Sequence, residues 1–135
     1  MTLLFVYGTL LYKVDSRMAN FLKDNGRHLG SAYINGRLYE IDGYPGVVVS
    51  DKSGEKVIGN IFAIEDEETV FTELDKYEEV GPTFAQPNEY KREKLEAFMN
   101  DGQKVRCWVY TYNHSVDKLR QIASGDYWSY VNKSN

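Results

Sequence analysis

The first hydrophobic pattern along the chain is a continuous apolar run at residues 3–7 (Leu-Leu-Phe-Val-Tyr), which ends at Gly8-Thr9. A short run of this kind is typical of a strand buried on both faces. Gly8 permits a sharp turn or a positive φ where the strand ends. Successive backbone N–H groups of such a turn point one way and form a cradle for an anionic group. The alternative is an ordinary buried first strand that ends in a glycine turn.

The following segments alternate between helical and strand-like spacing. Apolar residues at helical intervals lie between the cap Asp15-Ser16 and the stop at Gly26, which predicts a helix over 16–25. The pattern then predicts a strand over 28–40, in which Gly30 and Gly36 indicate a bend or a bulge. A turn over 43–46, a strand over 47–49, a hairpin loop over 51–54 and a strand over 56–64 follow. These short strands favour an antiparallel sheet that curls into a small barrel.

The second half begins with the most acidic run of the chain, at residues 65–68. Acids are favoured in the first turn of a helix, so we interpret this run as the start of a helix that continues past Tyr77 to Gly81-Pro82. Two more strands are predicted over 89–99 and 104–112, joined by a turn at 100–102. The last 20 residues are predicted to form a short helix and an aromatic tail that packs against the body of the domain. The pattern as a whole predicts one α+β domain over residues 1–135.

Two of these elements carry candidate site residues. In the strand at 104–112, alternation places Val105, Cys107, Val109 and Thr111 on one face and Arg106, Trp108, Tyr110 and Tyr112 on the other. Packing is the default role of that aromatic face, and a pocket wall is the alternative.

In the helix that begins at the acidic run, about 100° per residue places Glu78 inside the apolar arc, and the polar side holds Glu73, Asp75 and Glu79. The apolar arc itself consists of Val70, Phe71, Leu74 and Tyr77. Burial and the negative end of the helix dipole would both raise the pKa of Glu78, which suits general acid and base chemistry near neutral pH. The alternative is a helix that ends at Tyr77, with Glu78 facing solvent or paired with Arg92.

Composition narrows the function classes. The net charge of −4 and the pI near 5.2 argue against a nucleic-acid or anionic-membrane surface. A single cysteine, Cys107, excludes an internal disulfide and suits a reducing compartment. No apolar run approaches the ~20 residues of a membrane span, and the first residues lack the basic region of a signal peptide. We therefore expect a cytoplasmic protein.

Most familiar catalytic motifs are absent from the sequence. His28 and His114 do not have metal-ligand spacing from each other or from Cys107. Gly8-Thr9 is too short for a phosphate loop, and the chain has no Gly-x-Ser-x-Gly nucleophile motif. If the protein is an enzyme, its nucleophile comes from the substrate or from water.

Several motifs together resemble the γ-glutamylcyclotransferase-like family, which includes AIG2-like proteins and γ-glutamylamine cyclotransferases. They occur in this order over nearly the whole chain: Phe5-Val6-Tyr7-Gly8-Thr9-Leu10, Gly43-Tyr44-Pro45-Gly46, Leu74-Asp75-x-Tyr77-Glu78, Tyr90-x-Arg92, Val109-Tyr110 and Ser124-Gly125-Asp126-Tyr127. The resemblance implies a small, mainly antiparallel β-barrel with a few short helices and a pocket at its mouth.

The resemblance also implies roles for individual residues. Tyr7, Gly8, Thr9 and Leu10 would hold the α-amino-acid end of a γ-glutamyl group, Glu78 would be the catalytic acid and base, and Tyr110 would lie beside the pocket. Tyr90 and Arg92 match a position that serves either local structure or the pocket edge. In the family reaction the α-amine of the substrate attacks its own γ-carbonyl, forms 5-oxoproline and expels an amine, so that no metal or cofactor is required.

The chain departs from the family pattern in two places. Many members have glycine where this chain has Glu79, whose carboxylate would either raise the pKa of Glu78 or face solvent. We expect the segment 79–89 to be longer than in some relatives and to shape the leaving-group side. We expect a monomer or homodimer that acts on a small γ-glutamyl compound. The alternatives are a non-catalytic protein of the same fold that binds an amino-acid-like or anionic ligand, and a γ-glutamyl-removing step on a biosynthetic intermediate.

Overall fold

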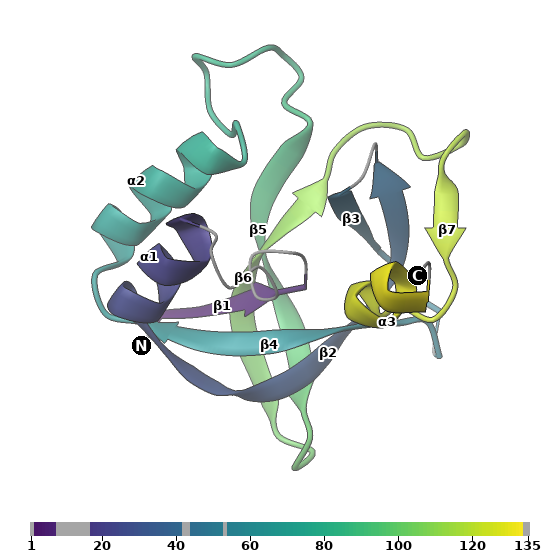
Figure 1. The fold of residues 1–135 in the computed structure, drawn as a ribbon, viewed down its shortest axis with the longest axis horizontal. Helices are drawn as coiled ribbons and strands as arrows, with labels where there is room; N and C mark the ends of the chain where they lie inside the picture. Colours follow the sequence, from purple (N-terminus) through teal and green to yellow (C-terminus); the bar gives the residue numbers. More distant parts are fainter. Residues whose placement is uncertain (1, 8–16, 42–43, 53, 134–135) are drawn as a thin grey trace.

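The computed structural model describes residues 2–7, 17–41, 44–52 and 54–133. Its elements, in chain order, are β1 (Thr2–Val6), α1 (Arg17–Asn25), β2 (Gly26–Ile41), β3 (Tyr44–Val49), β4 (Lys56–Ile64), α2 (Glu67–Tyr77), β5 (Tyr90–Met99), β6 (Lys104–Tyr112), β7 (Arg120–Ile122) and α3 (Tyr127–Lys133) (Figure 1). Across the described ranges, every helix is too short or too polar to span a membrane.

Five strands form a closed barrel in the order β2-β4-β1-β6-β5. The barrel closes where Ala32 and Tyr33 of β2 pair with Met99 and Phe98 of β5. β1 runs parallel to β6, and the other pairs in the barrel are antiparallel. The predicted α+β fold with a small, mainly antiparallel barrel is confirmed.

β2 is the longest described strand, and its two halves pair with different strands. Its first half pairs with β4, and its second half pairs with β3 and β7. The predicted bulge is present between His28 and Gly30, where Gly30 has a φ of 148°. The prediction of a hairpin loop at 51–54 was wrong, because this segment connects strands that flank β2 and do not pair with each other in the described part of the chain.

The predicted turn over 43–46 was also wrong for its last three residues. Gly43 lies outside the described residues, but Tyr44, Pro45 and Gly46 begin β3 and pair with β2. Gly46 is needed for close packing, because a Cβ at this position would overlap the Ile41 side chain and touch Tyr112. The glycine thus marks a position where the backbone of β3 lies close to side chains of β2 and β6.

The core has two parts, and β1 and β6 divide them. Phe5 and Val109 belong to the cluster inside the barrel, whereas Leu4 and Tyr110 belong to the cluster between the barrel and helices α1 and α2. The two helices cover the same side of the barrel in Figure 1. Burial of β1 on both faces and the alternation of β6 are therefore confirmed.

The C-terminal segment packs back on the barrel as predicted. Tyr127 of α3 is buried in the barrel cluster, and Asp126 caps the helix by accepting hydrogen bonds from the backbone and hydroxyl of Ser129. The three-residue strand β7 was not predicted as a strand, because three residues are too few to show an alternating pattern and its pairing with β2 is a long-range contact.

Candidate active site

A cavity of about 840 Å³ lies at the end of β1 and contains most of the predicted site residues that the structure describes. Its walls come from β1, the end of α2, the loop before β5, the starts of β3 and β5, the end of β6, and α3. The lining residues are mostly apolar or aromatic: Leu4, Phe5, Val6, Tyr7, Tyr44, Pro45, Leu74, Tyr77, Glu78, Glu79, Phe84, Ala85, Pro87, Glu89, Tyr90, Tyr110, His114, Tyr127, Trp128 and Val131.

Tyr7 fixes the end of β1 at this cavity. Its hydroxyl donates to the backbone carbonyl of Tyr110 (2.5 Å) and accepts from the backbone N–H of Val47 (3.3 Å), which ties β1 to β6 and β3. Burial and the nearby Glu78 carboxylate raise the pKa of Tyr7, so the phenol stays neutral. The next three predicted site residues, Gly8, Thr9 and Leu10, lie outside the described residues.

The end of α2 positions Glu78. The helix ends at Tyr77, Glu78 is its C-cap residue, and Glu79 follows with a φ of 56°. The backbone N–H groups of Glu79 and Val80 donate to the carbonyls of Lys76 (3.2 Å) and Asp75 (2.8 Å). This is the Schellman arrangement, in which the left-handed position is usually glycine. A glycine after the glutamate, which the resemblance leads us to expect at this position, would suit this backbone conformation.

The surroundings of Glu78 raise the pKa of its carboxyl from 4.5 to about 7. Burial is the larger cause and the negative charge of Glu89 is the second. The predicted effect of burial is confirmed. The neighbouring Glu79 is exposed, so the second carboxylate that acts on Glu78 is Glu89, which the sequence pattern did not identify.

The predicted arc of α2 was wrong for two residues. Tyr77, predicted to face the core, is 50% exposed at the cavity, and Asp75, predicted on the polar side, faces the sheet. The alternative prediction for this helix was correct in that it ends at Tyr77. Its other half was wrong: Glu78 lines the cavity, and Arg92 pairs with Asp75. The last turn lies against β5 and β6, so its polar side also has protein neighbours.

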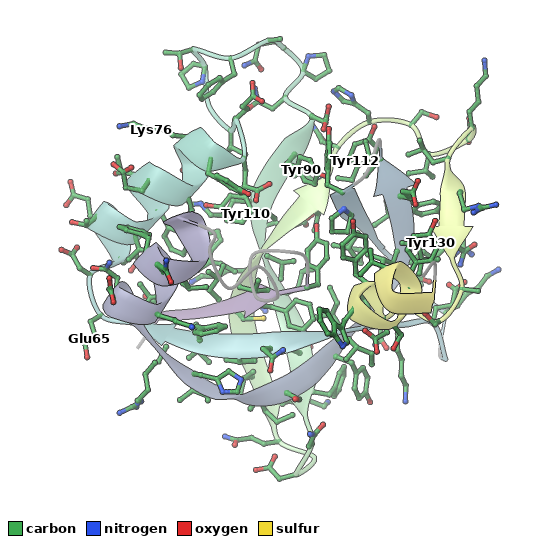
Figure 2. The ribbon with its side chains drawn as sticks, viewed as in Figure 1. Glu65, Lys76, Tyr90, Tyr110, Tyr112 and Tyr130 are labelled. Carbon is green, nitrogen blue, oxygen red and sulfur yellow. The ribbon has the colours of Figure 1, made fainter. Side chains whose placement is uncertain are left out.

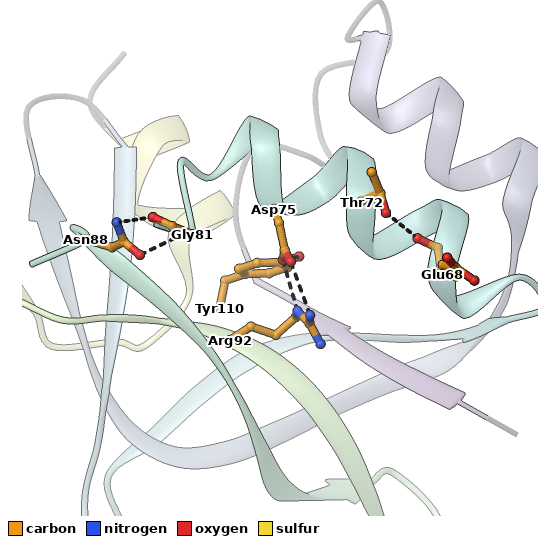
Figure 3. A network of polar contacts seen from close by, with 7 residues as sticks. All are labelled: Glu68, Thr72, Asp75, Gly81, Asn88, Arg92 and Tyr110. Atoms are coloured by element: carbon orange, nitrogen blue, oxygen red, sulfur yellow. Dashed lines mark hydrogen bonds and ion pairs between the residues drawn. The ribbon is translucent and has the colours of Figure 1, made fainter. Parts of the chain in front are cut away.

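Asp75 joins Tyr110 and Arg92 in one network (Figure 3). Asp75 Oδ1 accepts hydrogen bonds from the Tyr110 hydroxyl (2.6 Å) and from Arg92 Nε (2.9 Å), while Oδ2 accepts from Arg92 Nη2 (3.1 Å). Burial and the bond to Asp75 raise the pKa of Tyr110. Tyr110 therefore lines the cavity as a neutral phenol whose proton is already donated to a carboxylate.

A second group of residues surrounds Tyr90, for which the resemblance left local structure and the pocket edge as alternatives. Tyr90 lines the cavity, whereas Tyr44 and Glu89 beside it were not predicted as site residues. Glu89 accepts a hydrogen bond from the Tyr44 hydroxyl, and the Tyr90 hydroxyl donates to the Pro45 carbonyl (2.7 Å). Figure 2 shows Tyr90 near Tyr110, on the paired barrel strands β5 and β6. Burial, with Tyr7 and Glu78 nearby, raises the pKa of Tyr90. The sequence signal for this group was the Tyr-Pro pair at 44–45, which we interpreted as a turn.

The arrangement suits proton transfer. A carboxyl with a pKa near 7 can both accept and release a proton at neutral pH, and the surrounding phenols stay protonated. His114 also lines the cavity, with Nε2 3.0 Å from the Pro87 carbonyl oxygen. Within the described ranges, no three His, Cys, Asp or Glu side chains are placed to hold a metal ion.

Sequence comparison finds one family over most of the chain. A model of the family described as "Gamma-glutamyl cyclotransferase, AIG2-like" matches residues 4–129. The chain is 30% identical over 125 residues to the γ-glutamylcyclotransferase family protein YtfP of Escherichia coli K12, with 92% of this chain and 94% of that protein covered.

Solved structures share the fold. The crystal structure of YkqA from Bacillus subtilis matches with a TM-score of 0.70 and 23% identity, covering 99% of this chain and 43% of that chain, so this chain spans less than half of its length. The crystal structure of a mouse AIG2-like protein matches with a TM-score of 0.67 and 23% identity, covering 87% of this chain and 81% of that chain.

Proposed function

Because the chain belongs to the γ-glutamyl cyclotransferase, AIG2-like family, we propose that it is an enzyme that converts a γ-glutamyl amine, amino acid or peptide to 5-oxoproline and the free amine. Glu78 is the general base and acid of this reaction. Tyr7, Gly8, Thr9 and Leu10 hold the amino-acid head of the substrate, and Tyr110 forms part of the wall.

One observation carries the proposal. The Glu78 carboxyl, whose pKa is about 7, lines the same cavity as Tyr7, the last described residue before the Gly8-Thr9 segment. The cyclisation needs a proton acceptor close to the α-ammonium group and a means of fixing the α-carboxylate. A cavity that brings the end of β1 and the end of α2 together is consistent with both needs.

The proton and bond changes balance with one carboxyl group. Ionised Glu78 removes a proton from the α-ammonium group, and the freed amine nitrogen attacks the γ-carbonyl carbon. The bond between that carbon and the leaving nitrogen then breaks, and Glu78 returns the proton to this nitrogen. The attacking nitrogen loses its second proton as it becomes the lactam N–H, and Glu78 passes this proton to the same leaving nitrogen, so that the amine departs as an ammonium ion and Glu78 is ionised again. No water enters the reaction. The substrate must be folded on itself into a near-attack geometry, and the phenols and apolar side chains that line the cavity are the groups that would hold it in that shape.

The leaving amine lies against the loop before β5. Phe84, Ala85 and Pro87 of this loop line the cavity, so we propose that they contact the substituent of the amine. An internal framework fixes this loop: Asn88 accepts the Gly81 N–H and donates to the Gly81 and Ala85 carbonyls. A preformed wall of this kind favours some leaving groups over others.

The test is a panel of γ-glutamyl amines, amino acids and peptides, incubated with the purified protein and assayed for 5-oxoproline. We expect product from at least one compound, none with Glu78→Gln, and normal product with the matched control Glu73→Gln, whose side chain pairs with Lys76 on the exposed side of α2. Thermal unfolding would verify that both variants are folded. A compound that stabilises the protein against heat but is never turned over would favour the non-catalytic alternative.

A further inference from the structure

We propose that Asp75 and Arg92 form a positioning pair for Glu78, which holds the last turn of α2 against β5 and β6 and so keeps the Glu78 side chain in the cavity. The inference rests on the proposed function of Glu78. Neither residue lines the cavity itself; they lie in the neighbouring groove beside α2.

The contact between the two side chains is a two-point ion pair between different elements. Arg92 Nε and Nη2 donate to the two carboxylate oxygens of Asp75 at 2.9 and 3.1 Å, and both side chains are about three-quarters buried, with exposed fractions of 24% and 25%. A bidentate guanidinium–carboxylate pair fixes orientation as well as distance. The Tyr110 hydroxyl adds a third bond to the same carboxylate (Figure 3).

Arg92 is itself held in place by two aromatic rings. Its guanidinium carbon lies 4.2 Å from the centre of the Phe71 ring and 4.7 Å from the centre of the Trp108 ring. Phe71 belongs to α2 and Trp108 to β6, and Arg92 extends from β5 opposite Tyr110. The guanidinium therefore joins one helix to two strands and provides a fixed anchor for Asp75.

Asp75 also takes part in the capping turn that ends α2. Its backbone carbonyl accepts the Val80 N–H at 2.8 Å, and the Glu78 N–H donates to Leu74, the residue before Asp75, at 2.9 Å. The capping turn that holds Glu78 is thus built on the residue that the ion pair fixes. A shift of Asp75 relative to the sheet would carry Glu78 with it, and a misplacement of about 1 Å can lower a rate a hundredfold.

The pair also keeps the Arg92 guanidinium bound to Asp75. Burial and Glu89 set the raised pKa of Glu78, and a cation paired with Glu78 would act in the opposite direction. The titratable groups of the described chain that line the cavity with Glu78 come from the ends of β1, α2 and β6, the starts of β3, β5 and α3, and the adjoining loops: Tyr7, Tyr44, Tyr77, Glu79, Glu89, Tyr90, Tyr110, His114 and Tyr127.

The main test variant is Arg92→Lys, because it leaves the net charge unchanged but removes the two-point contact and the flat surface that stacks on the rings. Asp75→Asn is the second variant, and it removes the charged partner. Glu73→Gln is the matched control: it lies on the same helix, and its partner is Lys76 at 3.7 Å on the exposed side. Circular dichroism and thermal unfolding identify the variants that fold.

Two measurements on these variants decide the proposal. We expect kcat for 5-oxoproline formation to fall about tenfold to a hundredfold in Arg92→Lys and Asp75→Asn, with KM changed less than about threefold. Carbon-13 NMR of the Glu78 carboxyl, assigned with Glu78→Gln, should show its titration moving from a pKa of about 7 toward 4.5. Glu73→Gln should leave both kcat and the pKa of Glu78 unchanged.

The proposal is overturned if Glu78 titrates as in the wild type in folded Arg92→Lys and Asp75→Asn, or if Glu73→Gln has the same effects as those variants. The NMR titration does not depend on turnover. A wild type that forms no 5-oxoproline would therefore refute the proposed reaction, while the titration would still decide whether the pair positions Glu78.

Discussion

Glu78→Gln should make the protein more stable, and the gain should grow with pH. The folded structure raises the pKa of this carboxyl from 4.5 to about 7. Below about pH 4.5 the carboxyl is protonated in both the folded and the unfolded chain, so it does not penalise folding. Between 4.5 and 7 the unfolded chain ionises more readily than the folded one, so the stability of the wild type falls as pH rises. Above about pH 7 the loss is complete.

The size of the loss follows from the two pKa values. The difference between 4.5 and about 7 corresponds to about 3 kcal/mol at about 1.4 kcal/mol per tenfold change in ionisation. Because Glu78 is partly exposed in the cavity, water screens part of this penalty, and about 1–3 kcal/mol is the realistic range. Glutamine has nearly the same shape and stays neutral, so the variant avoids the penalty.

Urea unfolding of wild type and Glu78→Gln at several pH values between about 4 and 8 measures this difference. We expect nearly equal free energies of unfolding at about pH 4 and a gain of about 1–3 kcal/mol for the variant at about pH 8. Glu79→Gln is the control, because its side chain is exposed and should give a small difference that does not follow pH. A difference for Glu78→Gln that is constant with pH, or a loss of stability at about pH 8, would refute the reasoning.

Three further predictions concern single residues. Glu89→Gln removes a charge that raises the pKa of Glu78, so the acid limb of the kcat/KM–pH profile should move to lower pH; an unmoved limb would contradict the assigned cause. Glu79→Gly relieves the positive φ and should raise the free energy of unfolding by about 0.5–1 kcal/mol in denaturant titrations, whereas a loss would argue against the strain. Tyr7→Phe leaves the Tyr110 carbonyl without its buried donor and should cost about 1–3 kcal/mol by thermal unfolding; wild-type stability would exclude that role.

Much of the fold followed from local sequence patterns. The apolar run at 3–7 predicted a strand buried on both faces, and alternation at 104–112 separated the two core clusters, because each pattern reports on the immediate surroundings of a strand. The bulge at Gly30 was also accessible from sequence. Barrel closure between β2 and β5 was expected only as a tendency of short antiparallel strands to curl.

The errors came from long-range packing. Tyr44-Pro45-Gly46 has the composition of a turn, but pairing with β2 and the space beside Ile41 decide its structure. Asp75 has the position of a solvent-facing residue on a helical wheel, but the end of α2 lies against the sheet and gives it Arg92 as a partner. Glu89 had no local signal, because its effect on Glu78 depends on a loop that folds back over the helix end.

The central claim is that Glu78 moves the protons of an intramolecular cyclisation. The most direct test quantifies 5-oxoproline and free amine together by mass spectrometry, for wild type and Glu78→Gln with the same γ-glutamyl compound. The account predicts equal amounts of the two products from the wild type, and a rate at least about a hundredfold lower in the folded variant. Undiminished 5-oxoproline formation by Glu78→Gln, or release of the amine with glutamate in place of 5-oxoproline, would contradict it.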